Sequence, residues 1–203
     1  MKKSLIWSFL VSLLFIAPVT MAADEDVIKV VDDAAQKVLK RFESRKDELK
    51  AHPERIHDAV ADLVKPHFDF NALTQSAMGK HWRRASSADK RSVVKAFSEL
   101  LMRTYGSALL NYSGKPIEYG EARRSKDNLR VLVPSKVTTA SGSLVTIDYI
   151  LHKPGRAWLV SDVKIEGISL AANYRTSFAN EIRSGGVTGL VAKLEERNKA
   201  LVN

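Results

Sequence analysis

Apolar side chains recur every three or four positions through the first half of the chain, and this spacing predicts amphipathic helices. The first helix is expected over residues 27–49, where charged residues separate the apolar positions. A second helix is expected after Pro53 and before Pro66, because proline is tolerated in the first turn of a helix and disrupts its interior.

Two further helical regions precede a change of pattern. Residues 68–82 predict short helical pieces with an interruption near Gly79. Ser86 and Asp89 have the spacing of an approximate capping box, so a long helix with a broad apolar face should begin there. Gly114 and the proline that follows it should end this helix.

The pattern then alternates between apolar and polar residues, which is typical of strands. Turn-forming clusters separate four such segments, at residues 117–123, 129–138, 144–153 and 156–166. Because the turns are short, the strands should form an antiparallel meander. In the third strand Val145, Ile147, Tyr149 and Leu151 share one face, so the sheet should have one apolar face.

Two last helices are expected over residues 169–183 and 187–198, separated by Gly185 and Gly186. Helices that precede and follow an antiparallel meander in the sequence predict an α+β fold. The length of the chain after residue 23 suits one domain, over residues 24–203.

Residues 1–23 have the composition of a cleavable secretory signal peptide. Lys2 and Lys3 precede an apolar run, and the segment ends in the small residues Ala22 and Ala23. The run is shorter than the roughly 20 apolar residues that a membrane-spanning helix needs. Export with cleavage is therefore favoured over a membrane anchor.

Composition excludes some functions. The chain has no cysteine, so disulfides, thiolate catalysis and zinc–thiolate ligation are ruled out. Its net charge of +9 falls to +7 when Lys2 and Lys3 are removed. That charge suits anionic lipid surfaces or acidic partners, and equally an ordinary basic soluble protein. No nucleic-acid recognition motif is present.

The sequence shows no recognisable catalytic or metal-binding set. Its five histidines lack the spacing of a zinc protease helix, no acidic loop has calcium-binding spacing, and no G-x-S-x-G motif occurs. The glycines at residues 185–189 lack the Lys-Ser/Thr ending of a phosphate-binding loop. We therefore expect no bound metal and no catalytic residues.

Asp162 invites a catalytic interpretation, because a carboxyl among apolar neighbours can act as a general base. A structural ion pair or hydrogen bond is the favoured interpretation, with Arg175, just downstream, as the candidate partner. The alternative function is an enzyme that acts on a small apolar or lipid substrate, with Asp162 or Asp148 as the base.

Several helices and one sheet face all present apolar surfaces, and these surfaces could fill a core or enclose a cavity. Periodicity does not distinguish the two. A filled core would indicate a purely structural interaction domain.

Short motifs in a particular order make the chain resemble a known family. They are F-D-F at residues 68–70, G-K-H-W-R at 79–83, Tyr105, Trp158 before Asp162, E-G-x-S at 166–169, and Y-R-x-x-F at 174–178. With these motifs the chain resembles the MlaC or toluene-tolerance family of periplasmic phospholipid-binding proteins. It departs from the family pattern at Ser161, where a tyrosine is common.

The resemblance implies a curved, four-stranded sheet of the nuclear transport factor 2 (NTF2-like) type, wrapped by helices around an apolar cavity. It implies a periplasmic phospholipid carrier without a cofactor. Its partners would be an outer-membrane Mla lipoprotein–porin complex and an inner-membrane Mla ABC transporter complex. Exposing about thirty chain methylenes to water would cost roughly 24 kcal/mol, so a carrier has to shield them.

Under this interpretation, apolar and aromatic side chains of the helices and the sheet bind the lipid. We expect these to be Leu73, Met78, Trp82, Phe97, Leu101, Tyr105, Leu109, Val131, Val133, Val145, Ile147, Tyr149 and Tyr174. Asp162, Gly167 and Arg175 would then serve the junction between the last strand and the following helix.

Overall fold

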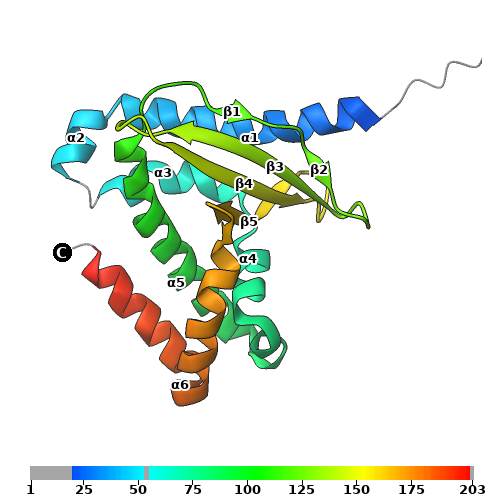
Figure 1. Ribbon diagram of the computed structural model, residues 1–203. Coiled ribbons are helices and arrows are strands. Elements are labelled where there is room, and N and C mark those ends of the chain that lie inside the picture. The colour runs from blue at the N-terminus through cyan, green and yellow to red at the C-terminus, as the bar shows by residue number, and fades with distance from the viewer. Residues whose placement is uncertain (1–19, 53–54, 202–203) are drawn as a thin grey trace, which may run out of the picture.

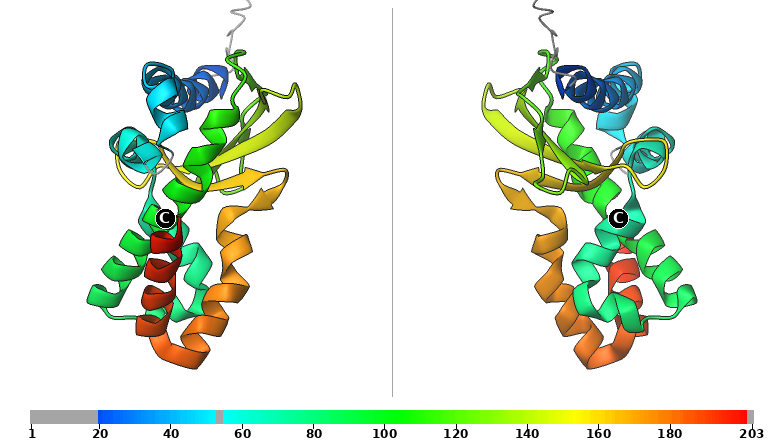
Figure 2. Two further views of the ribbon diagram at one scale, coloured as in Figure 1. Left: turned by 90° about the vertical axis from the view of Figure 1, so that its left-hand side faces the viewer. Right: turned by 90° about the vertical axis from the view of Figure 1, so that its right-hand side faces the viewer.

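The computed structural model describes residues 20–52 and 55–201. An antiparallel sheet lies beside α1, and α4, α5 and α6 form a helical group that extends away from it (Figures 1 and 2). The helices are α1 (Thr20–Glu43), α2 (Lys46–Ala51), α3 (Ile56–Val64), η2 (Lys65–His67), α4 (Phe70–Met78), η3 (Gly79–Arg84), α5 (Ser87–Gly106), η4 (Ser107–Asn111) and α6 (Leu170–Ala200).

The predicted signal peptide is described only in part. Residues 1–19 lie outside the described residues, and α1 begins at Thr20, within the predicted segment. Cleavage near Ala23 therefore stays a prediction. Within residues 20–52 and 55–201, no helix has the length and apolar character to span a bilayer.

The first predicted helix, over residues 27–49, is in fact two helices, and its predicted continuity is wrong. The chain leaves α1 at Glu43, and Arg45 has non-helical backbone angles before α2 begins. The break allows Phe42 of α1 and Leu49 of α2 to be buried together against α3. This small cluster holds α2 at one end of the molecule.

The start of α5 and the interruption of α6 agree with the predictions from the sequence. Asp89 N donates to Ser86 Oγ at 3.1 Å and Ser86 N donates to Asp89 Oδ2 at 3.3 Å, which completes the capping box of α5. The helical segment α6 is interrupted at Gly186, where φ is 66° and ψ is −170°. The chain turns back there, so the two halves of α6 form a hairpin (Figure 1).

The sheet has six strands instead of the four expected, and the three long strands form the predicted antiparallel meander β3–β4–β5. The order along the sheet is β1-β3-β4-β5-β6, and β2 also pairs with β3. The strands are β1 (Glu118–Tyr119), β2 (Arg123–Arg124), β3 (Arg130–Thr138), β4 (Leu144–His152), β5 (Leu159–Ile165) and β6 (Ile168–Ser169).

The predicted first strand, over residues 117–123, is divided because β3 contains Pro134. Proline has no N–H to donate to a neighbouring strand. Tyr119 is opposite Ser135 and Arg123 is opposite Leu132, so the register changes between β1 and β2. Gly120 sits at this break, where an added Cβ would approach Pro134 Cγ to 3.0 Å.

A tight turn ends β5 and adds β6 to the edge of the sheet. Glu166 and Gly167 both have positive φ, at 51° and 78°, as a two-residue hairpin turn of this type requires. The Glu166 carboxylate accepts hydrogen bonds from Thr146 N at 2.5 Å and Thr146 Oγ1 at 3.0 Å. The turn is thereby fastened to β4.

Asp162 connects the sheet to α6, but the ion pair that we expected with Arg175 is wrong. Its carboxylate accepts from Val163 N at 2.9 Å, Ala171 N at 3.2 Å and Ser169 Oγ at 2.5 Å. Arg175 instead donates from Nε and Nη2 to Ser76 O of α4, at 3.2 and 3.1 Å. Hydrogen bonding to the helix start satisfies this carboxylate without a cation.

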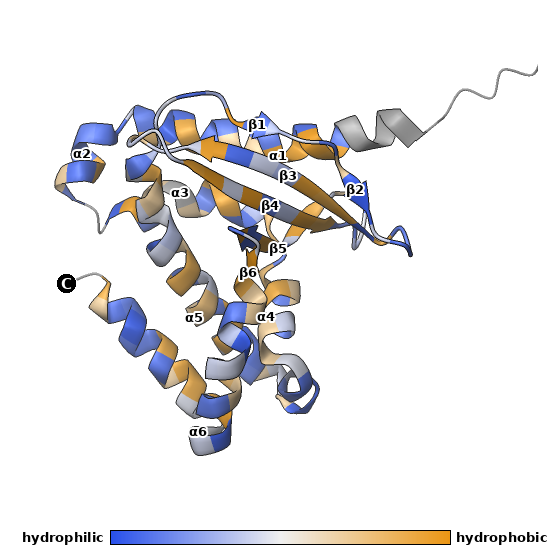
Figure 3. Cartoon of the chain, viewed as in Figure 1, coloured by the Kyte–Doolittle hydropathy of each residue, from blue (hydrophilic) through white to orange (hydrophobic). Residues whose placement is uncertain are grey.

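One continuous cluster of buried apolar residues joins the sheet, α1 and the helical group. Phe97 of α5 forms its aromatic centre with Tyr174 and Phe178 of α6, each at a ring-centroid distance of 4.8 Å. Hydrophobic residues follow β3, β4 and α5, whereas α2 and the turn between β2 and β3 are largely hydrophilic (Figure 3).

Candidate functional site

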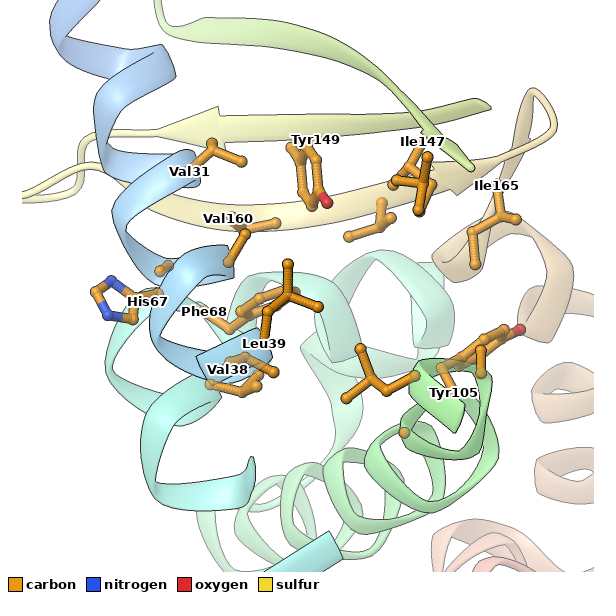
Figure 4. Close-up of a pocket in the computed structure, with 18 of the residues that line it drawn as sticks. Val31, Val38, Leu39, His67, Phe68, Tyr105, Ile147, Tyr149, Val160 and Ile165 are labelled. Atoms are coloured by element: carbon orange, nitrogen blue, oxygen red, sulfur yellow. The ribbon is translucent and has the colours of Figure 1, made fainter. Parts of the chain in front are cut away.

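An apolar cavity of about 360 Å³ lies between α1, one face of the sheet, and α5 with η4 (Figure 4). Helices and strands both contribute to its wall, mostly through apolar side chains. The lining residues are Val30, Val31, Ala34, Ala35, Val38, Leu39, Leu63, Val64, His67, Phe68, Phe70, Leu73, Leu101, Met102, Tyr105, Gly106, Ala108, Leu109, Asn111, Tyr112, Ile117, Val137, Thr138, Thr139, Val145, Ile147, Tyr149, Val160, Val163, Ile165 and Leu170.

The sheet contributes one face of β4 to the cavity. Val145, Ile147 and Tyr149 line it, as the alternation of the sequence predicted for a single apolar face. Thr146, between them, is exposed on the other side. The strand therefore separates the cavity from solvent.

The helix α5 and its extension η4 form the wall that faces the sheet. Leu101, Tyr105 and Leu109 follow one another at intervals of four residues and line the cavity. Gly106 allows α3 to pack closely, because a Cβ at this position would lie 2.9 Å from Ile56 Cγ2. A larger residue at position 106 would therefore require the Ile56 side chain or its helix to shift.

The ionisable side chains at the cavity wall are held neutral near pH 7. Burial raises the pKa of the Tyr105, Tyr112 and Tyr149 hydroxyls above the ordinary value for tyrosine. Burial, and then the nearby Lys37, lower the pKa of His67 below the ordinary value for histidine. The cavity thus offers an apolar, uncharged environment with a few hydroxyl groups.

Part of the predicted lipid-binding set lies at this cavity. Those that line it are Leu73, Leu101, Tyr105, Leu109, Val145, Ile147 and Tyr149. The figure shows Ile147 and Tyr149 reaching into the space from the sheet, with Tyr105 on the opposite wall (Figure 4).

The other predicted residues lie outside the cavity wall. They are Met78, Trp82, Phe97, Val131, Val133 and Tyr174. Phe97 and Tyr174 fill the aromatic centre of the helical group. Trp82 stacks beneath Lys90, with Nζ at 5.3 Å from the ring centroid. Met78, Val131 and Val133 are fully buried in the core and belong to the main apolar cluster.

The largest group of lining residues that sequence reasoning missed belongs to α1. Val30, Val31, Val38 and Leu39 all line the cavity. Because these residues occur as neighbouring pairs, the apolar stripe of α1 is wider than one made of single residues at every third or fourth position. This width is the sequence signal from which the cavity wall could have been predicted. Phe68 and Val160, which form an isolated parallel bridge, were missed as well.

Neither carboxylate that we considered as a base is at the cavity. Asp148 lies between Ile147 and Tyr149 in β4 and faces the other side of the sheet. The Asp162 carboxylate accepts from Val163 N of β5 and from Ser169 Oγ and Ala171 N at the start of α6. Among the described residues, no group of three or more histidines and carboxylates is placed to hold a metal ion. The enzyme hypothesis built on these two carboxylates is therefore contradicted by their positions.

The sequence is similar to proteins of one family. A profile of the family described as MlaC protein matches residues 32–196. The toluene tolerance protein ttg2D of Pseudomonas putida is 28% identical over 178 residues, which cover 87% of this chain and 82% of that protein. The intermembrane phospholipid transport system binding protein MlaC of Haemophilus influenzae is 20% identical over 185 residues, covering 90% of this chain and 86% of that protein.

A solved structure agrees with these matches. It is the phospholipid-binding protein from Ralstonia solanacearum in complex with a phospholipid, and its TM-score is 0.77 at 33% sequence identity. The match covers 86% of this chain and 98% of that one. Since the family profile and the fold both extend over most of the sequence, the chain belongs to the MlaC family.

Proposed function

We propose that this protein is a phospholipid carrier that encloses acyl chains in the cavity between α1, the sheet and α5. The observation that carries the proposal is the apolar wall of that cavity, in a fold whose relative from Ralstonia solanacearum was solved with a phospholipid. The cavity volume of about 360 Å³ falls within the usual range for small-molecule sites, roughly 300 to 1,000 Å³.

The energetics favour a carrier of this kind. Transferring about thirty chain methylenes into water costs roughly 24 kcal/mol, at about 0.8 kcal/mol for each. A wall of valine, leucine and isoleucine side chains removes most of that cost without a specific hydrogen bond. Binding should therefore depend on the acyl chains more than on the identity of the headgroup.

Membership of the MlaC family supports the following cellular role as part of this proposal. The carrier works in the periplasm, after removal of a signal peptide, and exchanges lipid with an outer-membrane Mla lipoprotein–porin complex and an inner-membrane Mla ABC transporter complex. The sheet and α1 act as an NTF2-like cone that shields the lipid during transit. No chemical conversion of the lipid is part of this role.

Lipid exchange with vesicles tests the proposal. Lipid-free protein is incubated with donor vesicles that contain a labelled glycerophospholipid, separated from them, and then mixed with unlabelled acceptor vesicles. We expect the label to bind to the protein and afterwards to reach the acceptor vesicles unchanged. Protein that takes up no lipid, or that returns a hydrolysed or modified lipid, would contradict the carrier function.

A further inference from the structure

The cavity wall beside β5 includes a short connection between two helices. This wall segment, residues 67–70, runs from the end of η2 to the start of α4. Its side chains His67, Phe68 and Phe70 line the cavity, as does Val160 of β5. The Phe68 and Phe70 rings stack with 5.5 Å between their centroids, and Phe68 is paired with Val160 (Figure 4). The segment therefore supplies two stacked rings to the wall next to the sheet.

Asp69, between these two rings in the sequence, fastens the wall segment to two strands. Asp69 N donates to Val160 O of β5 at 2.8 Å. Its carboxylate oxygen Oδ2 accepts from His152 Nε2 of β4 at 2.9 Å. Because His152 is opposite Leu159 of β5 in the sheet, the Asp69 side chain reaches past β5 to the next strand. Neither Asp69 nor His152 lines the cavity, so their contact supports the wall from outside.

The other carboxylate oxygen of Asp69 caps α4. Oδ1 accepts from Ala72 N at 2.9 Å, which satisfies one of the free N–H groups at the start of that helix. The side chain therefore has two contacts that substitution can separate. Serine is also a good N-cap residue, but its single hydroxyl lies too close to the backbone to replace the contact with His152 as well.

The contact between Asp69 and His152 is largely shielded from water. The two side chains are 18% and 24% exposed. An ionised carboxylate only accepts hydrogen bonds, so His152 Nε2 carries the proton in this pair. A hydrogen bond to a charged group is stronger than one between neutral groups, and salt screens it less when it is partly buried. This contact is therefore strong enough to affect where the wall segment lies.

We propose that Asp69 is a positioning residue for the cavity wall, which through His152 holds Phe68 and Phe70 against the bound acyl chains and so slows the release of lipid. This inference rests on the proposed carrier function. When the contact is lost, the wall segment separates from β5 more often, and each opening exposes the side of the cavity between them. The contact thus sets how long the cargo is retained, whereas the apolar lining sets whether it binds.

Lipid-release rates of variants that separate the two contacts of Asp69 test this proposal. Each protein is loaded with labelled phosphatidylglycerol and mixed with excess unlabelled acceptor vesicles, and its melting temperature is measured. Asp69→Ser keeps the helix cap and loses the link, His152→Ala loses the link from the other side, and His152→Gln keeps an N–H donor. Ser86→Ala is the control, because it removes the N-cap of α5, whose lining residues begin only at Leu101.

We expect Asp69→Ser and His152→Ala each to release lipid about fivefold faster than the wild type, and the double variant to be no faster than either. His152→Gln and Ser86→Ala should release lipid at nearly the wild-type rate. Wild-type rates in both Asp69→Ser and His152→Ala would overturn the positioning role and leave the carrier function standing. Equal acceleration in Ser86→Ala would also overturn it, because lost stability would then explain the effect. Wild-type protein that takes up no lipid would instead refute the carrier function.

Amide hydrogen exchange tests the same contact without lipid, because exchange reports local opening of a folded protein. In lipid-free His152→Ala, the Asp69 amide should exchange about fivefold faster than in the wild type, since its bond to Val160 O breaks whenever the wall segment opens. The Ala72 amide, which bonds to the Asp69 side chain within the same helix start, should be unchanged. Unchanged exchange at Asp69 would show that His152 does not hold the segment, and the proposal would be wrong.

Discussion

Among single side chains, Ile147 has the position that best separates a cavity from an ordinary core. It lies in the middle of β4, and its side chain enters the cavity across from Tyr105 (Figure 4). Val133, on the neighbouring strand, has a similar size and is fully buried outside the cavity wall. The two residues therefore form a matched pair for the same substitution.

Ile147→Trp should fill the cavity and exclude phospholipid while the protein stays folded, because the larger ring enters empty space. Val133→Trp should instead strain close-packed core and destabilise the fold by about 1 to 3 kcal/mol. Melting temperature and bound phospholipid are measured for both variants. Normal lipid loading in a well-folded Ile147→Trp protein would show that the acyl chains lie elsewhere.

Asp162→Asn should lower the stability of the fold by about 1 to 3 kcal/mol, because the carboxylate accepts three hydrogen bonds, one from β5 and two from the start of α6, and an amide has one oxygen to offer. Chemical denaturation measures the change. Asp148→Asn, on the outer face of β4, is the control and should be close to neutral. Unchanged stability of Asp162→Asn would mean that these hydrogen bonds contribute little to the junction.

Among the helices and strands, the sequence predicted those whose signal is local. The capping pair at Ser86 and Asp89 and the break at Gly186 both follow from residues close in the chain. The division between β1 and β2 does not, because it depends on Pro134 in the partner strand. Pairing partners are a tertiary property, and a single alternating segment does not reveal them.

The cavity illustrates the same limit for the site. Phe97 and Leu101 are four residues apart on the same face of α5, yet Phe97 fills an aromatic cluster and Leu101 lines the cavity. Periodicity tells which face of a helix is buried. Whether that face meets another side chain or an empty space depends on elements far away in the sequence, here α6 for one residue and α1 for the other.

The helix α2 should respond to acid through Glu48. Hydrogen bonds from Arg45 and Arg55 lower the pKa of Glu48 from 4.5 to about 2. Because the folded-state pKa is lowered, the stabilisation is present above pH 4.5 and is lost as the pH falls toward 2. An NMR titration should show Glu48 ionised at pH 3.5, and Arg45→Ala should raise its pKa toward the ordinary value. An unshifted pKa in the wild-type protein would contradict this ion-pair arrangement.

In the molecule as a whole, the position of the apolar cavity agrees with transport of an apolar cargo. The apolar cavity lies between the sheet, α1 and α5. The helical group of α4, α5 and α6 supports this part through one shared core. The fold thus supports an apolar cavity on a close-packed helical base.

Native mass spectrometry of the protein, purified from periplasm without detergent, tests whether the cavity carries lipid in the cell. We expect a complex whose added mass equals that of intact glycerophospholipid, with several headgroups represented, and we expect Ile147→Trp purified in the same way to lack that mass. Organic extraction of the same samples identifies the lipid. Wild-type protein that is free of lipid after this purification, and that acquires none from donor vesicles, would contradict the account.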